Sequence, residues 1–481
     1  MRPAGADNPP MPGPPAPPLS LERLPALDGI PPADAADAFR DLPGLALLES
    51  ARPGRAGRWS FLAAEPVGIV EGSAPGVDPF AEARGALARL DATPLPPGAP
   101  PFAGGLVGYL GYDAGRRLER LPARAIDDQG LPDLRLGLHA WAIAWDGRDG
   151  RAWLAGRAVD GDPDALARAL GGVRARAEAA VRVPLRGEPP FPRLAFRSEI
   201  DRSTWIAGVE AVRTAIAAGE LYQVNLSRRL AAPFDGEPWS VFRRLRAGEP
   251  AAFTAYLDLG PAAPGGPRRA VVSASPEPFL ALDGSGRVRT DPIKGTRPRG
   301  GTRAEDRALA GELLASGKDR AENMMIVDVL RNDLGRVCRP GSVRVPRLGR
   351  LERTPSVQHL VSTVTGRLAP GRDAFDLLAA TMPGGSITGA PKIRAMELIE
   401  SLEPIRRGPY CGAALWIDGG GAMGSSILIR TFVADGHRLT LHVGGGITWR
   451  SDPAAEWEET RTKARGPLRA IGAVVDGEEA R

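Results

Sequence analysis

Lysine is scarce in this chain, and its scarcity draws attention to one position. Only four of the 62 lysine and arginine residues are lysine: Lys294, Lys318, Lys392 and Lys463. A lysine ammonium can lose its proton when buried and then act as a nucleophile or base, whereas a guanidinium practically cannot. Lys294 lies between a predicted strand over residues 287–293 and a Gly-Thr turn, where a side chain can face a cleft. A solvated loop charge is the alternative for any single lysine.

Carboxylates on two predicted helices have the composition of a magnesium site. Glu456 and Glu459 are three residues apart, near a helix start predicted at residue 453, so they share one helix face. Glu322 follows Asp319 by three residues at the start of another helix. Mg²⁺ takes few protein oxygens and fills its other positions with water and an anionic substrate. Spacing alone favours a structural explanation for these carboxylates. Asp319 and Glu322 would form a capping box, and Glu456 and Glu459 would stabilise the positive end of their helix dipole.

Two glycine-rich loops could bind an anion. Residues 384–392, Gly-Gly-Ser-Ile-Thr-Gly-Ala-Pro-Lys, lead into a predicted helix, whose N-terminus and exposed N–H groups favour negative charge. This is not a Walker A loop, because Pro391 precedes the lysine and no Ser or Thr follows it. Residues 442–448, His-Val-Gly-Gly-Gly-Ile-Thr, allow a second close backbone approach. A carboxylate ligand fits these loops at least as well as a phosphate. That the loops are only tight turns without a ligand is an equally good explanation.

Further side chains could complete a site for an acid. Tyr410 and Arg430, which follows a predicted strand, could donate hydrogen bonds to a carboxylate. Glu277 lies one hairpin before Lys294, and a buried carboxylate with a raised pKa can act as general acid or base. His359 lies in an apolar segment, where a lone histidine is more often a core residue than a catalyst. Together these signals predict an anion-binding, magnesium-assisted active site built around a lysine.

Composition limits the class of protein. A chain of 481 residues, 43% hydrophobic and 25% charged, is typical of a globular protein with one large domain or two. A net charge of +5, an intermixed pattern of charge signs and only 5% aromatic residues argue against a nucleic-acid-binding protein. The pI near 9.5 is the one observation that favours nucleic-acid binding. Two cysteines imply no disulfide framework. No signal-peptide core or membrane-length apolar run is evident, so a cytoplasmic location without membrane contact is expected.

The order of predicted elements favours an α+β fold. Residues 1–18 are Pro-rich and predicted to be disordered. Residues 19–184 mix strands and helices, and a Pro-rich segment over 185–192 is the best linker candidate. Residues 195–470 carry the chemistry, including a predicted strand over 424–433. Strands and helices alternate without regular βαβ units, which argues against a doubly wound sheet.

Six segments, taken together, resemble the chorismate-utilising enzymes. They are Ser-Pro-Glu at 275–277, Pro-Ile-Lys-Gly-Thr-Arg-Pro-Arg at 292–299, Ala-Glu-Asn-Met-Met-Ile-Val-Asp-Val-Leu-Arg-Asn-Asp-Leu at 321–334, the loop at 384–392, Arg-Arg-Gly-Pro-Tyr at 406–410 and Glu-Thr-Arg-Thr-Lys-Ala at 459–464. Leu-Leu-Glu-Ser at 47–50 resembles the N-terminal region of the large subunits of anthranilate and aminodeoxychorismate synthases. The resemblance implies two packed antiparallel sheets flanked by helices, with chorismate in a cleft of the C-terminal region.

Within that family, position 294 separates the branches. Anthranilate synthases usually have alanine there, whereas aminodeoxychorismate synthases have lysine, as do isochorismate and salicylate synthases with different surrounding motifs. Residues 292–296 and 222–226, Tyr-Gln-Val-Asn-Leu, resemble the aminodeoxychorismate synthase branch. The resemblance thus implies replacement of the C4 hydroxyl of chorismate by an amino group, toward p-aminobenzoate and folate. Residues 249–253 stand where tryptophan-sensitive anthranilate synthases have Asn-Pro-x-Pro-Tyr-Met, which argues against feedback by tryptophan.

The resemblance also implies a role for each site residue. Mg²⁺ would be bound by four carboxylates: Glu322 and Glu459 directly, Asp319 and Glu456 in support through water. Lys294 would add at C2 as the hydroxyl leaves, Glu277 would protonate that hydroxyl, and ammonia would enter at C4 and expel the lysine. His359 would lie near the ring. Substrate contacts would come from Ser386, Tyr410, Arg430 and the backbone of Gly444 and Gly446, with Lys463 beside the metal-binding carboxylates.

The source of ammonia lies outside this chain. Neither Cys338 nor Cys411 has the setting of a glutaminase nucleophile, so a separate glutamine amidotransferase subunit is the expected partner. One alternative function is anthranilate synthase, which aminates chorismate at C2 and eliminates pyruvate. Another is a non-catalytic subunit that only binds and activates a glutaminase.

Overall fold

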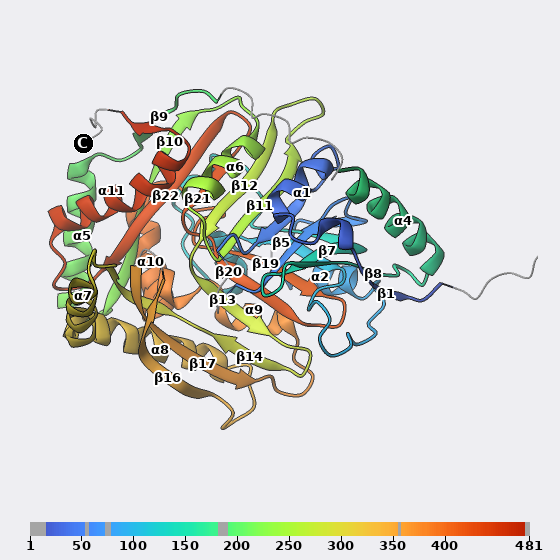
Figure 1. Cartoon of the computed structure of the whole chain (residues 1–481). Coiled ribbons are helices and arrows are strands. Elements are labelled where there is room, and N and C mark those ends of the chain that lie inside the picture. The colour runs from blue at the N-terminus through green and yellow to red at the C-terminus, as the bar shows by residue number, and fades with distance from the viewer. Residues whose placement is uncertain (1–15, 53–56, 73–77, 181–190, 355–356, 477–481) are drawn as a thin grey trace, which may run out of the picture.

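The chain forms two sheets that pack face to face and are flanked by helices (Figure 1). The computed structural model describes residues 16–52, 57–72, 78–180, 191–354 and 357–476. The α+β class predicted from the sequence is confirmed. Residues 1–15 of the predicted disordered segment and residues 185–190 of the predicted linker lie outside the described residues.

The larger sheet has thirteen strands in the described part of the chain. In spatial order they are β1 (Leu19–Arg23), β8 (Arg151–Arg157), β7 (Trp141–Asp146), β3 (Trp59–Ala63), β2 (Ala46–Glu49), β11 (Phe253–Pro261), β12 (Arg268–Ser275), β21 (Thr431–Ala434), β22 (Arg438–Ile447), β10 (Gln223–Pro233), β9 (Ala195–Ser198) and β23 (Val474–Val475), with β18 (Gly389–Ala390) beside β10. Neighbouring strands are antiparallel apart from β9 and β23, which pair in parallel.

The smaller sheet has ten strands within the described ranges. In spatial order they are β15 (Ile293–Pro298), β17 (Val357–Arg367), β14 (Arg287–Thr290), β13 (Pro278–Leu282), β20 (Met423–Ile427), β19 (Ala413–Asp418), β5 (Gly105–Leu110), β6 (Leu134–His139) and β4 (Gly68–Val70), with β16 (Arg344–Arg353) beside β17. Strands from the two halves of the chain are neighbours in both sheets, since β2 pairs with β11 and β5 with β19.

Helices cover the outer faces of both sheets. They are α1 (Pro32–Ala36), α2 (Ala81–Leu87), α3 (Gly115–Leu118), α4 (Pro163–Ala180), α5 (Arg202–Ala217), α6 (Pro238–Gly248), α7 (Arg303–Ala315), α8 (Gly317–Gly335), α9 (Ala374–Thr381), α10 (Lys392–Leu402) and α11 (Pro453–Ala470). One core cluster joins α4, α6 and α11 to the larger sheet, and another joins α8, α9 and α10 to the smaller sheet. Helices α8 and α11 matter most here because each carries carboxylates of the predicted metal site.

A third core layer lies between the sheets. On β2, Ala46 faces this layer and the next residue, Leu47, faces the outer helices. Val271 from the larger sheet and Val107 from the smaller one meet in the same layer. Alternating side chains of a strand point to opposite faces, so strands covered on both faces must be apolar at nearly every position. This accounts for the near-continuous apolar runs of β5 and β7.

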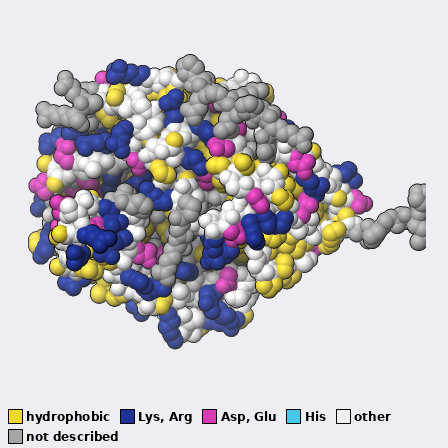
Figure 2. Space-filling model, in the orientation of Figure 1, with side chains coloured by type: hydrophobic (Ala, Val, Ile, Leu, Met, Phe, Trp, Pro, Cys, Tyr) yellow, Lys and Arg dark blue, Asp and Glu magenta, His cyan; other side chains and the backbone are white. Residues whose placement is uncertain are grey.

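Charges of both signs share the surface. On the face in Figure 2, Lys and Arg lie among Asp and Glu instead of forming one basic stripe. Buried arginines can also be paired; for example, Nη2 of the buried Arg229 lies 2.5 Å from Asp128 Oδ2. In the described part of the chain, no helix combines the length and apolar character needed to cross a membrane.

Two predicted strands are broken in the structure. The strand predicted over 424–433 is β20 of one sheet and β21 of the other, because the chain crosses between sheets at Arg430, whose φ is +50°. The strand predicted over 287–293 is interrupted at Asp291 and Pro292, where the proline has no N–H to donate, and the two pieces, β14 and the start of β15, both pair with the long strand β17. Lys294 therefore lies inside a strand, beside an irregularity at Gly295 (φ +80°), and its predicted place at a strand end was wrong.

Candidate active site

Lys294 and Glu277 meet at Ser386. Lys294 Nζ donates to the backbone carbonyl of Ser386 at 3.4 Å, and Ser386 Oγ donates to Glu277 Oε1 at 2.9 Å. Lys294 comes from β15, Ser386 from a short 3₁₀ turn (Gly385–Ile387) in the first glycine-rich loop, and Glu277 from the connection between β12 and β13. The fold thus brings together three predicted site residues that come from separate sequence motifs.

The surroundings of Glu277 suit a general acid. Burial raises the pKa of Glu277, while the charges of Lys294 and Lys463 and the hydrogen bond from Ser386 oppose part of that rise. A carboxyl with a raised pKa remains protonated to a higher pH than an exposed glutamate and can then donate a proton. The two lysines that act on Glu277 are both residues of the predicted site.

Three glutamates form the second part of the site. Glu322, on α8, has a buried Oε1 without a hydrogen-bond partner among the described residues. Glu456 and Glu459, on α11, face the second glycine-rich segment, which was predicted as a loop but lies in strand β22 up to Ile447. A Cβ added to Gly445 would lie 3.3 Å from Glu456 Oε2 and 3.3 Å from Glu459 Oε1. A glycine at this position lets the backbone of β22 approach both carboxylates. The shared helix face predicted for Glu456 and Glu459 is confirmed, and the charge of Glu459 also acts on Glu322 of the other helix.

Neighbouring charges shift the pKa of each glutamate. Burial raises the pKa of Glu322 and of Glu456, and the negative charge of Glu459 adds to both rises. Lys318 opposes both. At Glu459 burial acts in the same upward sense, but it is outweighed by the ammonium of Lys463, 2.7 Å from Oε1, so the pKa of Glu459 is lowered. The cluster combines like-charge repulsion with partial neutralisation by lysines.

The oxygen donors of this cluster suit a hard divalent cation. Mg²⁺ prefers carboxylate oxygens and water, and the unpartnered Oε1 of Glu322 is a buried acceptor that a cation would satisfy. Within the described ranges, however, no three His, Cys, Asp or Glu side chains are already arranged as metal ligands. The side chains fit magnesium in their chemistry, and its binding stays a prediction.

Helix α8 begins earlier than predicted. Ser316 is its N-cap and accepts a hydrogen bond from the backbone N–H of Asp319 at 3.2 Å. Glu322 therefore lies beyond the first turn, and the capping box considered for Asp319 and Glu322 was wrong, because the serine takes the capping position. The Asp319 side chain instead accepts a hydrogen bond from Arg297 Nη2 at 3.2 Å. Asp319 is thus held by β15, while Glu322 is directed to the cluster.

His359 and Arg430 are neighbours at the edge of the site. His359 Nδ1 lies 2.9 Å from Thr296 Oγ1, two residues after Lys294. Burial lowers the pKa of His359 to about 4, and the charge of Arg430 contributes to that shift. Arg430 Nη1 lies 3.5 Å from Glu249 Oε2, and the arginine side chain is 46% exposed. A neutral imidazole and an accessible guanidinium can both donate to or orient an acidic ligand.

The remaining predicted substrate contacts differ in their surroundings. Tyr410 is buried and stacks on His442, with ring centroids 5.0 Å apart and planes 10° from parallel. Gly444 accepts a hydrogen bond from Lys463 Nζ at 2.8 Å through its carbonyl. Gly446 packs against Gln223, because a Cβ there would come 2.7 Å from Gln223 Nε2. The two glycines lie beside the carboxylate cluster, whereas a substrate contact by Tyr410 stays a prediction.

Lys318 is not among the site residues predicted from the sequence. Its Nζ lies 3.8 Å from Glu322 Oε1, and its charge acts on the pKa of all three clustered glutamates. The available signal was its spacing, since Lys318 precedes Glu322 by four residues, one helical turn. That spacing is common on solvated helices, and it gains meaning only because the charge of Lys318 also reaches Glu456 and Glu459 of α11.

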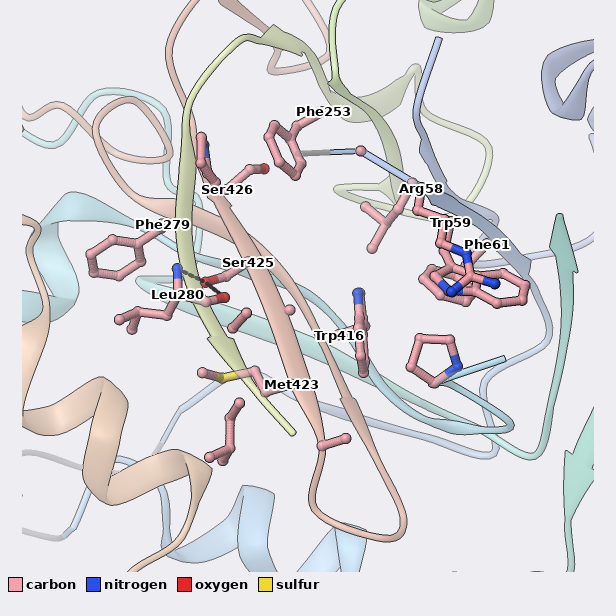
Figure 3. A pocket seen from close by; sticks show the side chains of 18 of the residues that line it. Arg58, Trp59, Phe61, Phe253, Phe279, Leu280, Trp416, Met423, Ser425 and Ser426 are labelled. Carbon is pink, nitrogen blue, oxygen red and sulfur yellow. Dashed lines mark hydrogen bonds between the residues drawn. The ribbon is translucent and has the colours of Figure 1, made fainter. Parts of the chain in front are cut away.

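A cavity of about 740 Å³ lies between the two sheets (Figure 3). Leu48 and Glu49 of β2 line it together with Phe253 of β11, and Phe61 and Trp416 meet in its wall with ring centroids 5.4 Å apart. None of the predicted catalytic, metal-binding or substrate-binding residues lines this cavity. Strand β13 contributes Pro278 to the cavity, directly after Glu277 of the candidate active site.

Comparisons with known proteins show which family this chain resembles. The family model for chorismate binding enzymes matches residues 47–469. Anthranilate synthase component 1 of Streptomyces coelicolor is 43% identical over 441 residues, which cover 88% of this chain and 83% of that protein. Aminodeoxychorismate synthase component 1 of Salmonella typhimurium is 43% identical over 394 residues, covering 82% of each. Anthranilate synthase component I of Streptococcus pneumoniae superposes with a TM-score of 0.76 at 30% identity, over 86% of this chain and 93% of that one.

The fold, the site and these similarities define the class of protein. The chain belongs to the chorismate-binding enzyme family. Inside the family the relatives divide between two reactions, both at 43% identity, so overall similarity does not select the reaction. That choice depends on the residues of the site.

Proposed function

We propose that this chain is the chorismate-aminating component of an aminodeoxychorismate synthase. It would convert chorismate and ammonia to 4-amino-4-deoxychorismate, the precursor of p-aminobenzoate and folate. The observation that carries the proposal is the contact chain from Lys294 through Ser386 to Glu277. A lysine at position 294 is typical of the aminodeoxychorismate synthase branch, and here it lies in a site that also offers an acid.

The chemistry follows from these two side chains. Neutral Lys294 forms a bond from Nζ to C2 of the ring, both conjugated ring double bonds shift by one position, and the C4–O bond breaks as Glu277 gives its proton to the departing hydroxyl, which leaves as water. Ammonia then forms a bond to C4, the two double bonds shift back, and the C2–Nζ bond breaks. A proton from the incoming nitrogen restores Glu277. Two attacks at opposite ends of the conjugated diene replace one difficult displacement.

The glutamate cluster would bind magnesium beside this centre. Glu322 and Glu459 are the proposed direct ligands, with Glu456 in support and Asp319, already held by Arg297, at the periphery. When bound, Mg²⁺ supplies a positive charge that holds one substrate carboxylate and draws electron density from the ring. Arg430 and backbone groups of Gly444 and Gly446 would hold the substrate's acidic groups, and neutral His359 would lie near the ring.

Ammonia would be supplied by a separate glutamine amidotransferase subunit. Both cysteines are buried, and burial raises the pKa of each thiol, that of Cys411 to about 12. A glutaminase nucleophile needs the thiolate, which a raised pKa disfavours. These features support the view that this chain does not hydrolyse glutamine itself.

Anthranilate synthase is the second candidate, favoured by relatives of that name at equal identity. The two reactions start from the same substrates, so product identity separates them. Incubation with chorismate, ammonium and Mg²⁺ should yield 4-amino-4-deoxychorismate. Anthranilate would support the second candidate, and absence of any turnover at saturating ammonium would support a non-catalytic, glutaminase-activating role.

A further inference from the structure

Three lysines lie around the glutamate cluster, and they are held differently. Lys463 Nζ lies 2.7 Å from Glu459 Oε1 and donates to the Gly444 carbonyl at 2.8 Å. Lys294 Nζ donates to the Ser386 carbonyl at 3.4 Å. Lys318 Nζ lies 3.8 Å from Glu322 Oε1, beyond hydrogen-bonding distance, and its side chain is 51% exposed. Lys318 is therefore the lysine that can leave most easily.

The atom that Lys318 faces lacks any better partner. Glu322 Oε1 is buried and accepts no hydrogen bond from the described residues. A buried carboxylate oxygen without a donor or cation is costly, and an ammonium at 3.8 Å lowers this cost only in part. Lys318 also influences the pKa of Glu456 and Glu459, so its charge reaches both glutamates of α11.

We propose that Lys318 is a displaceable counter-ion of the glutamate cluster formed by Glu322, Glu456 and Glu459. It neutralises part of the cluster when no divalent cation is bound, and it moves into solvent when a cation reaches Glu322. The inference rests on the proposed function, because it takes the cluster to be the magnesium site. Lys463, anchored by two contacts, stays in place in both states.

The exchange has consequences for the choice of cation. A divalent cation replaces one positive charge by two and satisfies Glu322 Oε1, so the exchange is favourable. A monovalent cation only replaces one unit charge by another and must also lose water, so it gains little. Lys318 would thus weaken cation binding overall and make the site selective for divalent ions. It would also limit repulsion among the glutamates in the metal-free protein.

The test measures cation binding directly, without substrate or turnover. Mn²⁺, a magnesium substitute with an electron paramagnetic resonance signal, is titrated into the full chain and into Lys318→Met, Lys318→Arg and Arg331→Met. Arg331 is the matched control, because it lies on the same helix and pairs with Asp328 instead of the cluster. Removing the competing charge should tighten Mn²⁺ binding about tenfold in Lys318→Met, while Lys318→Arg and Arg331→Met stay close to the parent.

Thermal unfolding without metal gives a second readout. Lys318→Met should unfold about 2 °C lower than the parent in chelator, and Mg²⁺ should restore more stability to this variant than to the parent. Unchanged or weaker Mn²⁺ binding by Lys318→Met, with normal binding by the parent, would overturn the counter-ion role and leave the magnesium site standing. A parent protein that binds no divalent cation would overturn both.

Discussion

Glu277 accepts a 2.9 Å hydrogen bond from Ser386, the residue whose backbone carbonyl also receives the ammonium of Lys294. An acid and a nucleophile are thereby fixed relative to each other through one serine. The loop that carries Ser386 is itself held by Lys392, which donates to Asp333 at 2.7 Å and to the Thr381 carbonyl at 2.9 Å. Such support is what a covalent mechanism needs, because small displacements of reacting groups are costly.

Replacing Lys294 by alanine should lower formation of aminodeoxychorismate by about 10³-fold or more, because it removes the amine proposed to form the bond to C2. Lys294→Arg should fail as well, since a guanidinium does not become a neutral nucleophile. Far-ultraviolet circular dichroism should stay unchanged. Arg350→Ala, an exposed change on β16, is the control and should keep parental turnover. Parental turnover by Lys294→Ala would remove the lysine from the mechanism.

Glu277→Gln should lower turnover by about 10²-fold to 10⁴-fold and remove a limb of the pH–rate profile. In the parent, kcat/KM should fall as pH rises through the raised pKa of Glu277, because only the protonated acid donates. The contribution of Glu277 to folding stability should also decrease as pH rises. The folded state holds this proton more tightly than the unfolded state, so stability is lost as pH rises from about 4.3 through the raised value. A pH profile unchanged by Glu277→Gln would contradict the role of acid.

His359 should be neutral throughout the working range. Its pKa is lowered to about 4 by burial and by Arg430, so protonation should destabilise the fold as pH falls from about 6.5 toward 4. Nuclear magnetic resonance of the imidazole signals, assigned by comparison with His359→Gln, should give a midpoint well below 6. A midpoint near 6.5 would show that the histidine is solvated and unable to lie beside the substrate as proposed.

Glu459→Gln should abolish the dependence of activity on Mg²⁺ concentration and weaken cation binding by about tenfold or more. Glu458→Gln is the matched control, since Glu458 is the preceding residue of α11 and pairs with Arg461 at the surface. Titration of both variants with Mg²⁺, followed by turnover and by calorimetry, separates the cases. Unchanged binding by Glu459→Gln would favour the helix-end explanation for these acidic residues.

Much of the site could be predicted because its parts lie in short, distinctive segments. The rarity of lysine selected Lys294, and the spacing of Glu456 and Glu459 placed both on one helix face, which the structure confirms through their shared contact with Gly445. The α+β class followed from the irregular order of strands and helices. These inferences depend on composition and local periodicity, which a sequence shows directly.

Other features depend on contacts between distant segments. The break between β20 and β21 at Arg430 could not be predicted, because residues 424–433 are suitable for a strand throughout and only partner strands in different sheets divide them. The N-cap of α8 was predicted at the wrong residue, because both Ser316 and Asp319 are suitable N-cap residues and the sequence does not show which one is used. The role proposed for Lys318 depends on its effect on Glu456 and Glu459, which lie on another helix and which no local pattern connects with it.

The proposal that Lys294 directs amination to C4 is tested most directly by the product of the purified chain. Chorismate, ammonium chloride and Mg²⁺ are incubated with the protein at mildly alkaline pH, and the products are separated by liquid chromatography and identified by mass and ultraviolet spectrum. The account predicts 4-amino-4-deoxychorismate, formed by the parent and lost in Lys294→Ala. Anthranilate as the main product, or 4-amino-4-deoxychorismate formed equally well by Lys294→Ala, would contradict it.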